Sequence, residues 1–131
     1  MDECADECGE CYRGPYAFSE PETIAIRDFL TDRKDEIKFS FNFHSYGNTW
    51  MIPFNGVSDN NLKTTNPKVY GILQEISDKA PFPEGMKHEG NSEAVLGQIV
   101  GGDADDYITG ELGIPSVTPE LGTDRQYIDS W

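Results

Sequence analysis

Basic residues are scarce in this sequence. Its 131 residues include 10 Lys and Arg against 24 Asp and Glu, which gives a net charge of −14 at pH 7. A surface with this charge repels phosphate backbones and anionic lipid headgroups. We therefore expect neither nucleic acid nor a membrane surface among the partners of this protein.

Long apolar runs are also absent. No stretch approaches the ~18 apolar residues of a membrane-spanning helix. The acidic start Met1-Asp2-Glu3 lacks the basic and apolar regions of a secretory signal peptide. The sequence therefore predicts either an intracellular protein or one whose N-terminal segment precedes Met1.

Cysteine occurs only at Cys4, Cys8 and Cys11, and an odd number leaves at least one thiol unpaired within the chain. The spacing C-x3-C-x2-C matches the iron–sulfur loop of radical enzymes that cleave S-adenosylmethionine, but that loop follows a barrel strand, for which there is no room before Cys4. The spacing favours disulfides to partners outside this segment, or reduced surface thiols. A small metal or redox module that also uses His88 is an alternative.

The length and composition predict a single domain over residues 1–131, which can bury about two-thirds of its extended surface. Residues 1–18 show little periodicity and are expected to form an irregular, cysteine-containing lead-in. A helix is predicted over residues 20–33, with Ser19 to Glu22 as a capping box. Its apolar stripe should pack on a sheet and contains Ala25, Ile26, Phe29 and Leu30.

Two further helices are predicted, over residues 67–79 and 104–112. The first should bury Val69, Ile72, Leu73 and Ile76, and the second should end on a left-handed Gly113. Apolar and polar residues alternate over residues 37–43, which predicts a strand with one apolar face. Shorter strands are expected at residues 50–52, 94–100 and 115–121, with a loop at residues 55–61. This alternation predicts an α/β fold with a mixed sheet flanked by helices.

Two of these predicted strands end at side chains that can bind a metal ion or transfer a proton. His44 follows the first strand and Glu120 lies at the end of the last, and open α/β sheets place their active sites where strands give way to loops. Zinc-dependent hydrolysis needs three protein ligands, an open position for water and a carboxylate that takes a proton from that water. His44 suits the role of ligand and Glu120 that of base.

Five segments, in order, carry a resemblance to a known family. They are Cys8 to Glu22, Phe43-His44-Ser45-Tyr46-Gly47, Ile52-Pro53-Phe54, Gly101 to Tyr107, and Gly113 to Gly122. They resemble the C-x-x-x-Y-x-G-x-x-x-S-E-x-E, H-S-Y, Y-P-aromatic, G-G-x-x-D-W and G-I-x-x-x-x-x-E-L segments of the zinc carboxypeptidases of the carboxypeptidase A type. The resemblance covers most of the chain, from Tyr12 to Gly122.

The resemblance implies the C-terminal part of a catalytic domain with a partial zinc-carboxypeptidase fold, of the phosphorylase/hydrolase-like kind. It implies zinc as the cofactor, His44 as the third zinc ligand and Glu120 as the general base, with Ser45 and Tyr46 bordering the substrate cleft. The substrates would be the C-termini of peptides or proteins, which lose their last residue. In this family the bonds Ser45–Tyr46 and Pro53–Phe54 would be cis.

Several family features are not found in the sequence. The family takes two more zinc ligands from an upstream H-x-x-E segment, and neither His44 nor His88 is followed by Glu at the third position. The upstream arginine that clamps the substrate carboxylate and the helix that follows the Glu120 strand are missing too. We therefore expect this chain alone to bind zinc poorly and to be inactive. A non-catalytic carboxypeptidase-like module that binds peptides or proteins is the alternative.

The resemblance also bears on specificity. Asp105 stands where family members that prefer C-terminal Lys or Arg carry Asp, although an acid at a helix N-terminus is also stabilised by the helix dipole. Gln98 stands where the family's mobile, substrate-capping tyrosine is expected, and Tyr107 replaces the usual Trp. The family and the cysteine-rich lead-in point to an extracellular, secretory or lysosomal compartment. A truncated sheet would leave exposed edges, so self-association is a further expectation.

Overall fold

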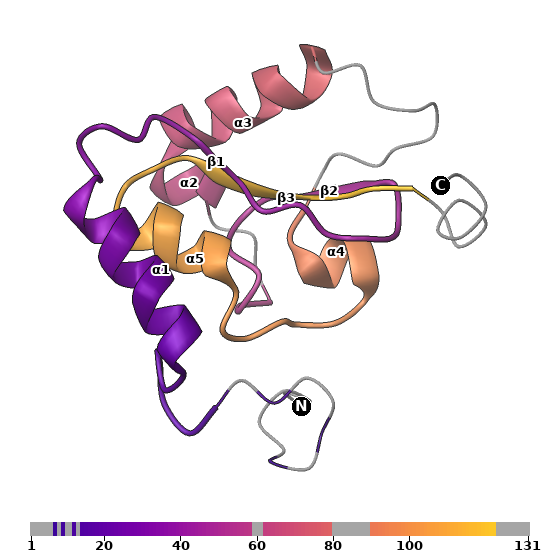
Figure 1. Ribbon diagram of the computed structural model, residues 1–131. Helices are drawn as coiled ribbons and strands as arrows, with labels where there is room; N and C mark the ends of the chain where they lie inside the picture. Colours follow the sequence, from indigo (N-terminus) through magenta and orange to yellow (C-terminus); the bar gives the residue numbers. More distant parts are fainter. Residues whose placement is uncertain are drawn as a thin grey trace.

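The computed structural model describes residues 14–58, 62–79 and 90–122, together with Glu7, Gly9 and Tyr12. Cys4, Cys8, Cys11 and His88 lie outside these residues. The described elements are α1 (Pro21–Asp32), β1 (Ser40–Phe41), β2 (Thr49–Met51), α2 (Leu62–Thr65), α3 (Pro67–Lys79), α4 (Ser92–Leu96), α5 (Ala104–Gly110) and β3 (Ser116–Glu120). They form the predicted α/β fold, with helices on both sides of the strands (Figure 1).

The three strands lie in the order β1-β3-β2, with β1 parallel and β2 antiparallel to β3. The sheet is therefore mixed, as predicted. Because β1 and β2 flank opposite sides of β3, the connection between them must pass over one end of the central strand. It passes over the carboxyl end, where the amide of Gly47 donates to the carbonyl of Gly122 (3.0 Å).

The two faces of the sheet differ in chemistry because successive side chains of a strand point to opposite sides. Val117 lies on the apolar face, and α2 and α3 cover that face (Figure 1). The buried cluster there consists of Trp50, Ile52, Leu62, Val69, Leu73 and Val117. Ser116, Thr118 and Glu120 point to the other face, where α5 packs against β3. This polar face carries the predicted chemistry.

The helix α3 has the predicted bounds. Val69 and Leu73 are buried and Ile72 and Ile76 are half-buried, as the periodicity required. The helix α5 ends at Gly110, two residues before the predicted end, and Gly113 has the expected left-handed backbone with φ 69°. Among the described residues no helix is long and apolar enough to cross a membrane.

The helix α1 lies where it was predicted, but the capping box is wrong. The helix starts at Pro21, so Glu20 is its N-cap residue and makes no side-chain capping bond. Ser19 therefore sits one position too early to reach the first-turn amides, and its hydroxyl donates to the carboxylate of Glu20 instead (2.9 Å).

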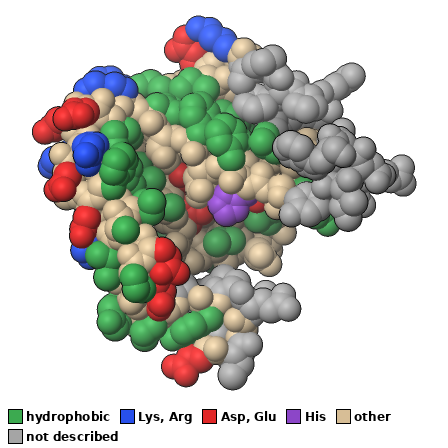
Figure 2. Space-filling view, in the orientation of Figure 1, with side chains coloured by type: hydrophobic (Ala, Val, Ile, Leu, Met, Phe, Trp, Pro, Cys, Tyr) green, Lys and Arg blue, Asp and Glu red, His purple; other side chains and the backbone are tan. Residues whose placement is uncertain are grey.

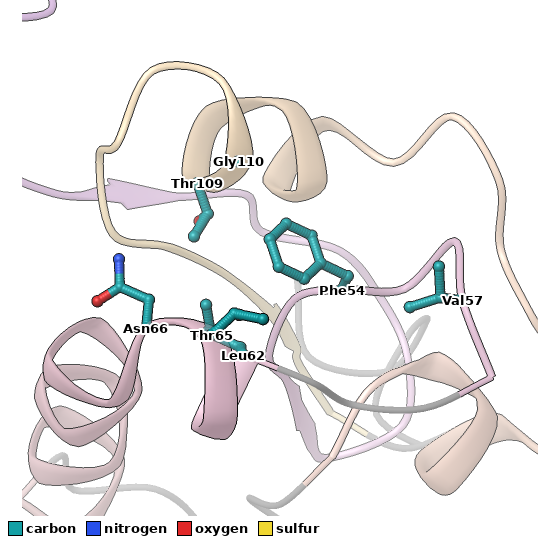
Figure 3. Close-up of a pocket in the computed structure, with 7 residues that line it drawn as sticks. All are labelled: Phe54, Val57, Leu62, Thr65, Asn66, Thr109 and Gly110. Carbon is teal, nitrogen blue, oxygen red and sulfur yellow. The ribbon is translucent and has the colours of Figure 1, made fainter.

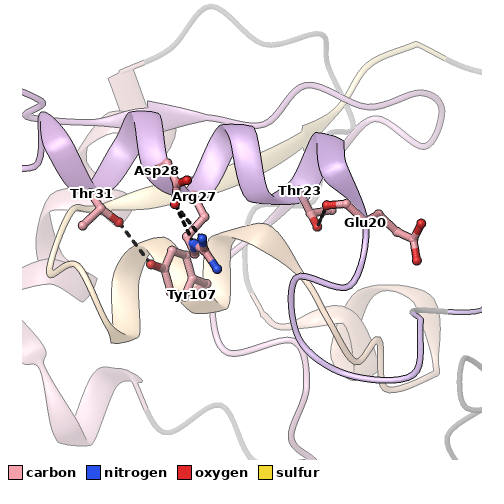
Figure 4. Close-up of polar contacts among 6 residues, drawn as sticks. All are labelled: Glu20, Thr23, Arg27, Asp28, Thr31 and Tyr107. Atoms are coloured by element: carbon pink, nitrogen blue, oxygen red, sulfur yellow. Dashed lines mark hydrogen bonds and ion pairs between the residues drawn. The ribbon is translucent and has the colours of Figure 1, made fainter.

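The packing predicted for α1 is wrong as well. Of its apolar stripe only Leu30 is buried, and it joins Ile108 of α5 and Ile114 rather than the sheet. Ile26 and Phe29 are 59% and 51% exposed. The polar face of the sheet is already covered by α5, so α1 packs on α5. Figure 4 shows this junction, where the hydroxyls of Thr31 and Tyr107 lie 3.4 Å apart.

The strand predicted over residues 37–43 is shorter and less buried than expected. Regular strand covers only Ser40–Phe41, although the amide of Asn42 still donates to the carbonyl of Val117 (3.0 Å). Because β1 is an edge strand, Phe41 and Phe43 are 45% and 62% exposed.

The strand predicted over residues 94–100 does not exist. The segment begins with α4, whose N-cap Asn91 accepts from the amide of Ala94 (3.2 Å), and Gly97 ends it with φ 80°. Local capping chemistry thus decides this segment in favour of a helix. The short α2, within the region where no element was predicted, is a further difference.

Candidate active site at the carboxyl end of the central strand

His44 and Glu120 are paired across the sheet. The amide of His44 donates to the carbonyl of Pro119 (3.0 Å), and the amide of Leu121 donates to the carbonyl of His44 (2.9 Å). These two bonds form a parallel bridge between His44 and Glu120. Paired residues of neighbouring strands point their side chains to the same face. The imidazole and the carboxylate therefore share the polar face, as the predicted chemistry requires.

Pro119 takes part in this bridge although it lies in a central strand, where a proline has no amide proton to donate to a neighbouring strand. Its carbonyl is still used, since it accepts from His44. The hydrogen bonds between the strands thus continue to the end of β3, with one amide donor fewer.

The turn over residues 45–48 brings the next predicted residues to the same end of the sheet. Ser45 and Tyr46 are exposed, Tyr46 to 56%. The bonds Ser45–Tyr46 and Pro53–Phe54 are both cis, as the resemblance implied. A Cβ on Gly47 would lie 3.4 Å from the Cβ of Glu120, so the turn passes directly against the predicted base.

Glu120 is half-buried beside an exposed imidazole. Burial raises the pKa of its carboxyl group, and the neighbouring His44 acts in the opposite direction. Its Oε2 atom is buried and has no hydrogen-bond partner within the described part of the chain. In Figure 2 a histidine side chain is open to the surface with acidic side chains beside it. The buried Oε2 atom thus lacks the hydrogen-bond donor that a buried acceptor normally has.

Asp105 lies under the same face, completely buried. The hydroxyl groups of Ser116 and Thr118 donate to its two carboxylate oxygens. Burial and the nearby charge of Asp103 raise the pKa of Asp105 to about 7, although the two hydroxyl groups lower it. Asp105 therefore joins α5 to β3.

A second acid fixes the start of α5 against the segment after β2. The carboxylate of Asp106 accepts from the amides of Asn55 and Gly56, both at 2.7 Å. Burial raises the pKa of Asp106 to about 6, against the effect of these two amides. The side chain of Asn55 in turn accepts from the amide of Ser92 (2.7 Å). This network ties β2, α4 and α5 together around the site.

A cavity of ≈ 1070 Å³ opens beside the site, between the segment before α1, α1 itself and the start of α5. Asn42, two residues before His44, lines it together with Gly102, Asp103 and Tyr107. Asp105 is not among its lining residues, and Gln98 lies on the exposed turn after α4. The cavity thus meets the polar face of the sheet close to His44.

A second cavity of ≈ 370 Å³ lies away from the predicted residues, between α2, α5 and the segment after β2 (Figure 3). Its lining includes Phe54, Leu62 and Thr109. None of the six residues predicted for the site lines it.

The described residues fit one part of a zinc site. His44 offers an exposed imidazole, which is a common zinc ligand, and Glu120 offers a carboxylate on the same face. Among residues 14–58, 62–79 and 90–122 no group of three His, Cys, Asp or Glu side chains could hold a metal ion. The described residues thus provide one candidate zinc ligand, His44, and one candidate base, Glu120.

A family model described as zinc carboxypeptidase matches residues 3–128. The match covers nearly the whole chain. The chain belongs to the zinc carboxypeptidase family. Zinc is accordingly the metal that this family uses, in agreement with the prediction from the sequence.

Individual relatives agree with this assignment. Carboxypeptidase B of Astacus astacus is 30% identical over 107 residues, which are 82% of this chain and 35% of that protein. Carboxypeptidase B of Helicoverpa zea is 32% identical over 121 residues, 87% of this chain and 27% of that protein. The zinc-carboxypeptidase chain described here thus spans about a third of these relatives.

A solved structure shows the same fold. Bovine thrombin-activatable fibrinolysis inhibitor, in complex with tick carboxypeptidase inhibitor, matches with a TM-score of 0.65 and 24% identity, over 94% of this chain and 41% of that one. The partial zinc-carboxypeptidase fold predicted from the sequence is therefore confirmed.

Sequence reasoning did not find every residue of the site. Ser116 and Thr118 alternate with Val117 and therefore share a face with Glu120, so the period of β3 could have identified them. Asp103 was not predicted as a site residue. Its position in the cavity wall depends on how the Gly101–Gly102 turn folds, which no local pattern reveals.

Proposed function

We propose that this chain supplies the C-terminal part of the active site of a zinc carboxypeptidase, which removes the last residue of peptides or proteins. The observation that carries the proposal is the bridge between His44 and Glu120, which puts a ligand and a base on one face. The related enzymes named carboxypeptidase B favour this function over a non-catalytic peptide-binding module.

The roles of the residues follow from their chemistry. Zinc, when bound, polarises a water molecule and the scissile carbonyl group. His44 provides one imidazole ligand. Glu120 takes the proton from the attacking water and returns it to the leaving amine. A group that must first accept and then release a proton works best when its pKa lies near the working pH. Burial raises the pKa of the Glu120 carboxyl group and so moves it in this direction.

The remaining predicted residues would act on the substrate. Ser45 and Tyr46 are exposed on the turn beside Glu120 and would border the approach of the peptide. Gln98 is exposed and would stand in place of a capping tyrosine, without its phenolic donor. Asp105 stands where family members that prefer C-terminal Lys or Arg carry Asp, which supports a preference for basic C-terminal residues.

The chain by itself is expected to be inactive. A catalytic zinc ion needs three protein ligands, and His44 offers one. We propose that the other two come from an upstream H-x-x-E segment of the same protein. The proposed compartment is extracellular, secretory or lysosomal. Self-association through the exposed β1 edge is also proposed, because Phe41 and Phe43 are exposed there.

The test uses the longest reading frame that contains this chain, expressed with zinc and supplied with benzoyl-Gly-Arg. Free arginine should be released, and Glu120→Gln should lower kcat by about 10²- to 10⁴-fold, because a positioned base contributes that much. The exposed Glu111→Gln is the control with the same change of charge. If no reading frame with H-x-x-E exists and the protein binds the peptide without cleaving it, the non-catalytic module is the correct function.

A further inference from the structure

Glu120 has a different neighbour on each side of the central strand. On one side the parallel bridge pairs it with His44, and on the other side the antiparallel register of β2 pairs it with Thr49. Paired residues of neighbouring strands point their side chains to the same face of a sheet. The imidazole, the carboxylate and the Thr49 hydroxyl group therefore form a row across the polar face, with the predicted base in the middle.

The Thr49 side chain is enclosed, and its hydroxyl group is unused. Thr49 is 8% exposed, and its Oγ1 atom is buried without a hydrogen-bond partner among the residues that the structure describes. The Oε2 atom of Glu120 is in the same situation. Buried polar groups are normally hydrogen-bonded, because an unpaired one loses the bonds that it made to water. A donor and an acceptor that both lack a partner thus lie on directly paired residues.

The hydroxyl groups of β3 are not available to Glu120. Ser116 and Thr118 donate to Asp105, and each hydroxyl group has a single proton. The proton of Thr49 has no such acceptor among the described residues. Directly opposed residues of an antiparallel pair have Cβ atoms about 4.5–5.5 Å apart, a distance that a rotation of the long Glu120 side chain can span.

The turn after His44 packs against both members of this pair. A Cβ placed on Gly47 would lie 3.4 Å from the Cβ atom of Glu120 and 3.4 Å from the Oγ1 atom of Thr49. The amide of Gly47 donates to the carbonyl of Gly122 (3.0 Å), which holds the turn in this place. The Thr49 hydroxyl group and the Glu120 side chain therefore lie under the same turn.

We infer that Thr49 positions Glu120, with its hydroxyl group donating to the Oε2 atom of the carboxylate. The bond satisfies both buried atoms and leaves the other carboxylate oxygen for the attacking water. This inference rests on the proposed function, in which Glu120 is the base. Thr49 acts only through Glu120, so it is a positioning residue and not a catalytic one.

The first experiment detects the bond in the 131-residue chain and does not depend on cleavage. A double-mutant cycle combines Thr49→Val, which keeps the shape and removes the hydroxyl group, with Glu120→Ala, and urea unfolding gives the folding equilibrium constant of all four chains. We expect Thr49→Val to lower this constant about tenfold when Glu120 is present, the effect of losing a hydrogen bond to a charged group, and clearly less when it is absent. Equal effects in both backgrounds would overturn the inference.

The second experiment asks whether the bond serves catalysis. In the longest reading frame that contains this chain, with zinc and benzoyl-Gly-Arg, Thr49→Val should lower kcat about tenfold and leave KM unchanged. Thr49→Ser keeps the hydroxyl group and should restore kcat. Thr64→Val makes the same change at an exposed position of α2 and should alter neither constant. An unchanged kcat in Thr49→Val, or a kcat that Thr49→Ser does not restore, would show that Thr49 does not position the base.

Failure of the proposed function would look different. In that case the unaltered protein releases no arginine, whatever residue stands at position 49. The double-mutant cycle still decides whether Thr49 and Glu120 are bonded, because it measures folding and not cleavage.

Discussion

Thr118 donates its hydroxyl proton to the carboxylate of Asp105 and so joins the central strand to α5, two residues before Glu120. Both residues are almost completely enclosed. The position of the predicted base therefore depends on a polar contact inside the protein. The Ser116 hydroxyl makes the equivalent bond to the other carboxylate oxygen.

Thr118→Val should destabilise the chain by about 1–3 kcal/mol, because it keeps the shape of the side chain and leaves the buried carboxylate short of one donor. Thr118→Ser is the matched control, since it keeps the hydroxyl group. Urea unfolding followed by circular dichroism gives both free energies of unfolding. Equal stability of the two variants would show that this hydrogen bond contributes nothing.

Stability should fall as the pH rises from about 4.5 to 7.5. The folded pKa values of Asp105, about 7, and Asp106, about 6, lie above the value of about 3.9 for an unfolded aspartate, chiefly because both groups are buried. The folded state therefore binds more protons than the unfolded state. The stabilisation that results is complete below the pKa of the unfolded state, and it is lost as the pH rises through the pKa values of the folded state. We expect a decrease of at least about 2 kcal/mol.

The same unfolding series with Asp105→Asn should give a flatter dependence on pH, because the group that titrates near neutrality has been removed. A free energy of unfolding that rises between these pH values in the unaltered chain would contradict the prediction.

Asn91 supports α4 in two ways, and two variants separate them. Its Oδ1 accepts from the amide of Ala94 (3.2 Å) and its Nδ2 donates to the carbonyl of Val57 (2.8 Å). Asn91→Ala loses both bonds and should cost about 1–2 kcal/mol. Asn91→Ser keeps a capping oxygen and loses the donor to Val57, so its loss should be smaller. The prediction fails if the two variants are equally destabilised in thermal unfolding.

Zinc binding by the 131-residue chain should be weak and should depend on His44. One imidazole cannot replace the three ligands of a catalytic zinc site. In equilibrium dialysis we expect no tightly held zinc, and NMR should show shifts at the His44 ring only at high zinc concentration. His44→Asn should remove these shifts. One tightly bound zinc ion per chain would refute this prediction.

Self-association should depend on the edge of the sheet. Phe43 is 62% exposed and its ring stacks on that of Phe41, with 5.6 Å between the centroids. Phe43→Ser should shift sedimentation toward the monomer, because it removes exposed apolar area from an unpaired edge. Phe29→Ser on α1, where the ring is 51% exposed, is the control and should have no effect. Equal effects of both substitutions would rule out the β1 edge as the contact.

Elements governed by local chemistry could be predicted well. The helix α3 has its predicted bounds because apolar residues at helical spacing precede two prolines, and β3 follows the left-handed Gly113 as expected. The capping box failed by one position at Ser19, since a proline at the first helical position defines the start of α1. The strand over residues 94–100 failed because Asn91 and Gly97 cap a helix there.

The sequence alone determined the family, the chemical character of His44 and Glu120 and the alternation of helices and strands, because these depend on residue identity and short spacings. Only the tertiary structure decided that α1 packs on α5, that Phe41 and Phe43 lie at an exposed edge, and that Asp103 lines the cavity while Asp105 is enclosed. Burial depends on which elements cover a residue, and those elements are distant in sequence. The sharing of one face by His44 and Glu120 likewise exists only once β1 and β3 are paired in register.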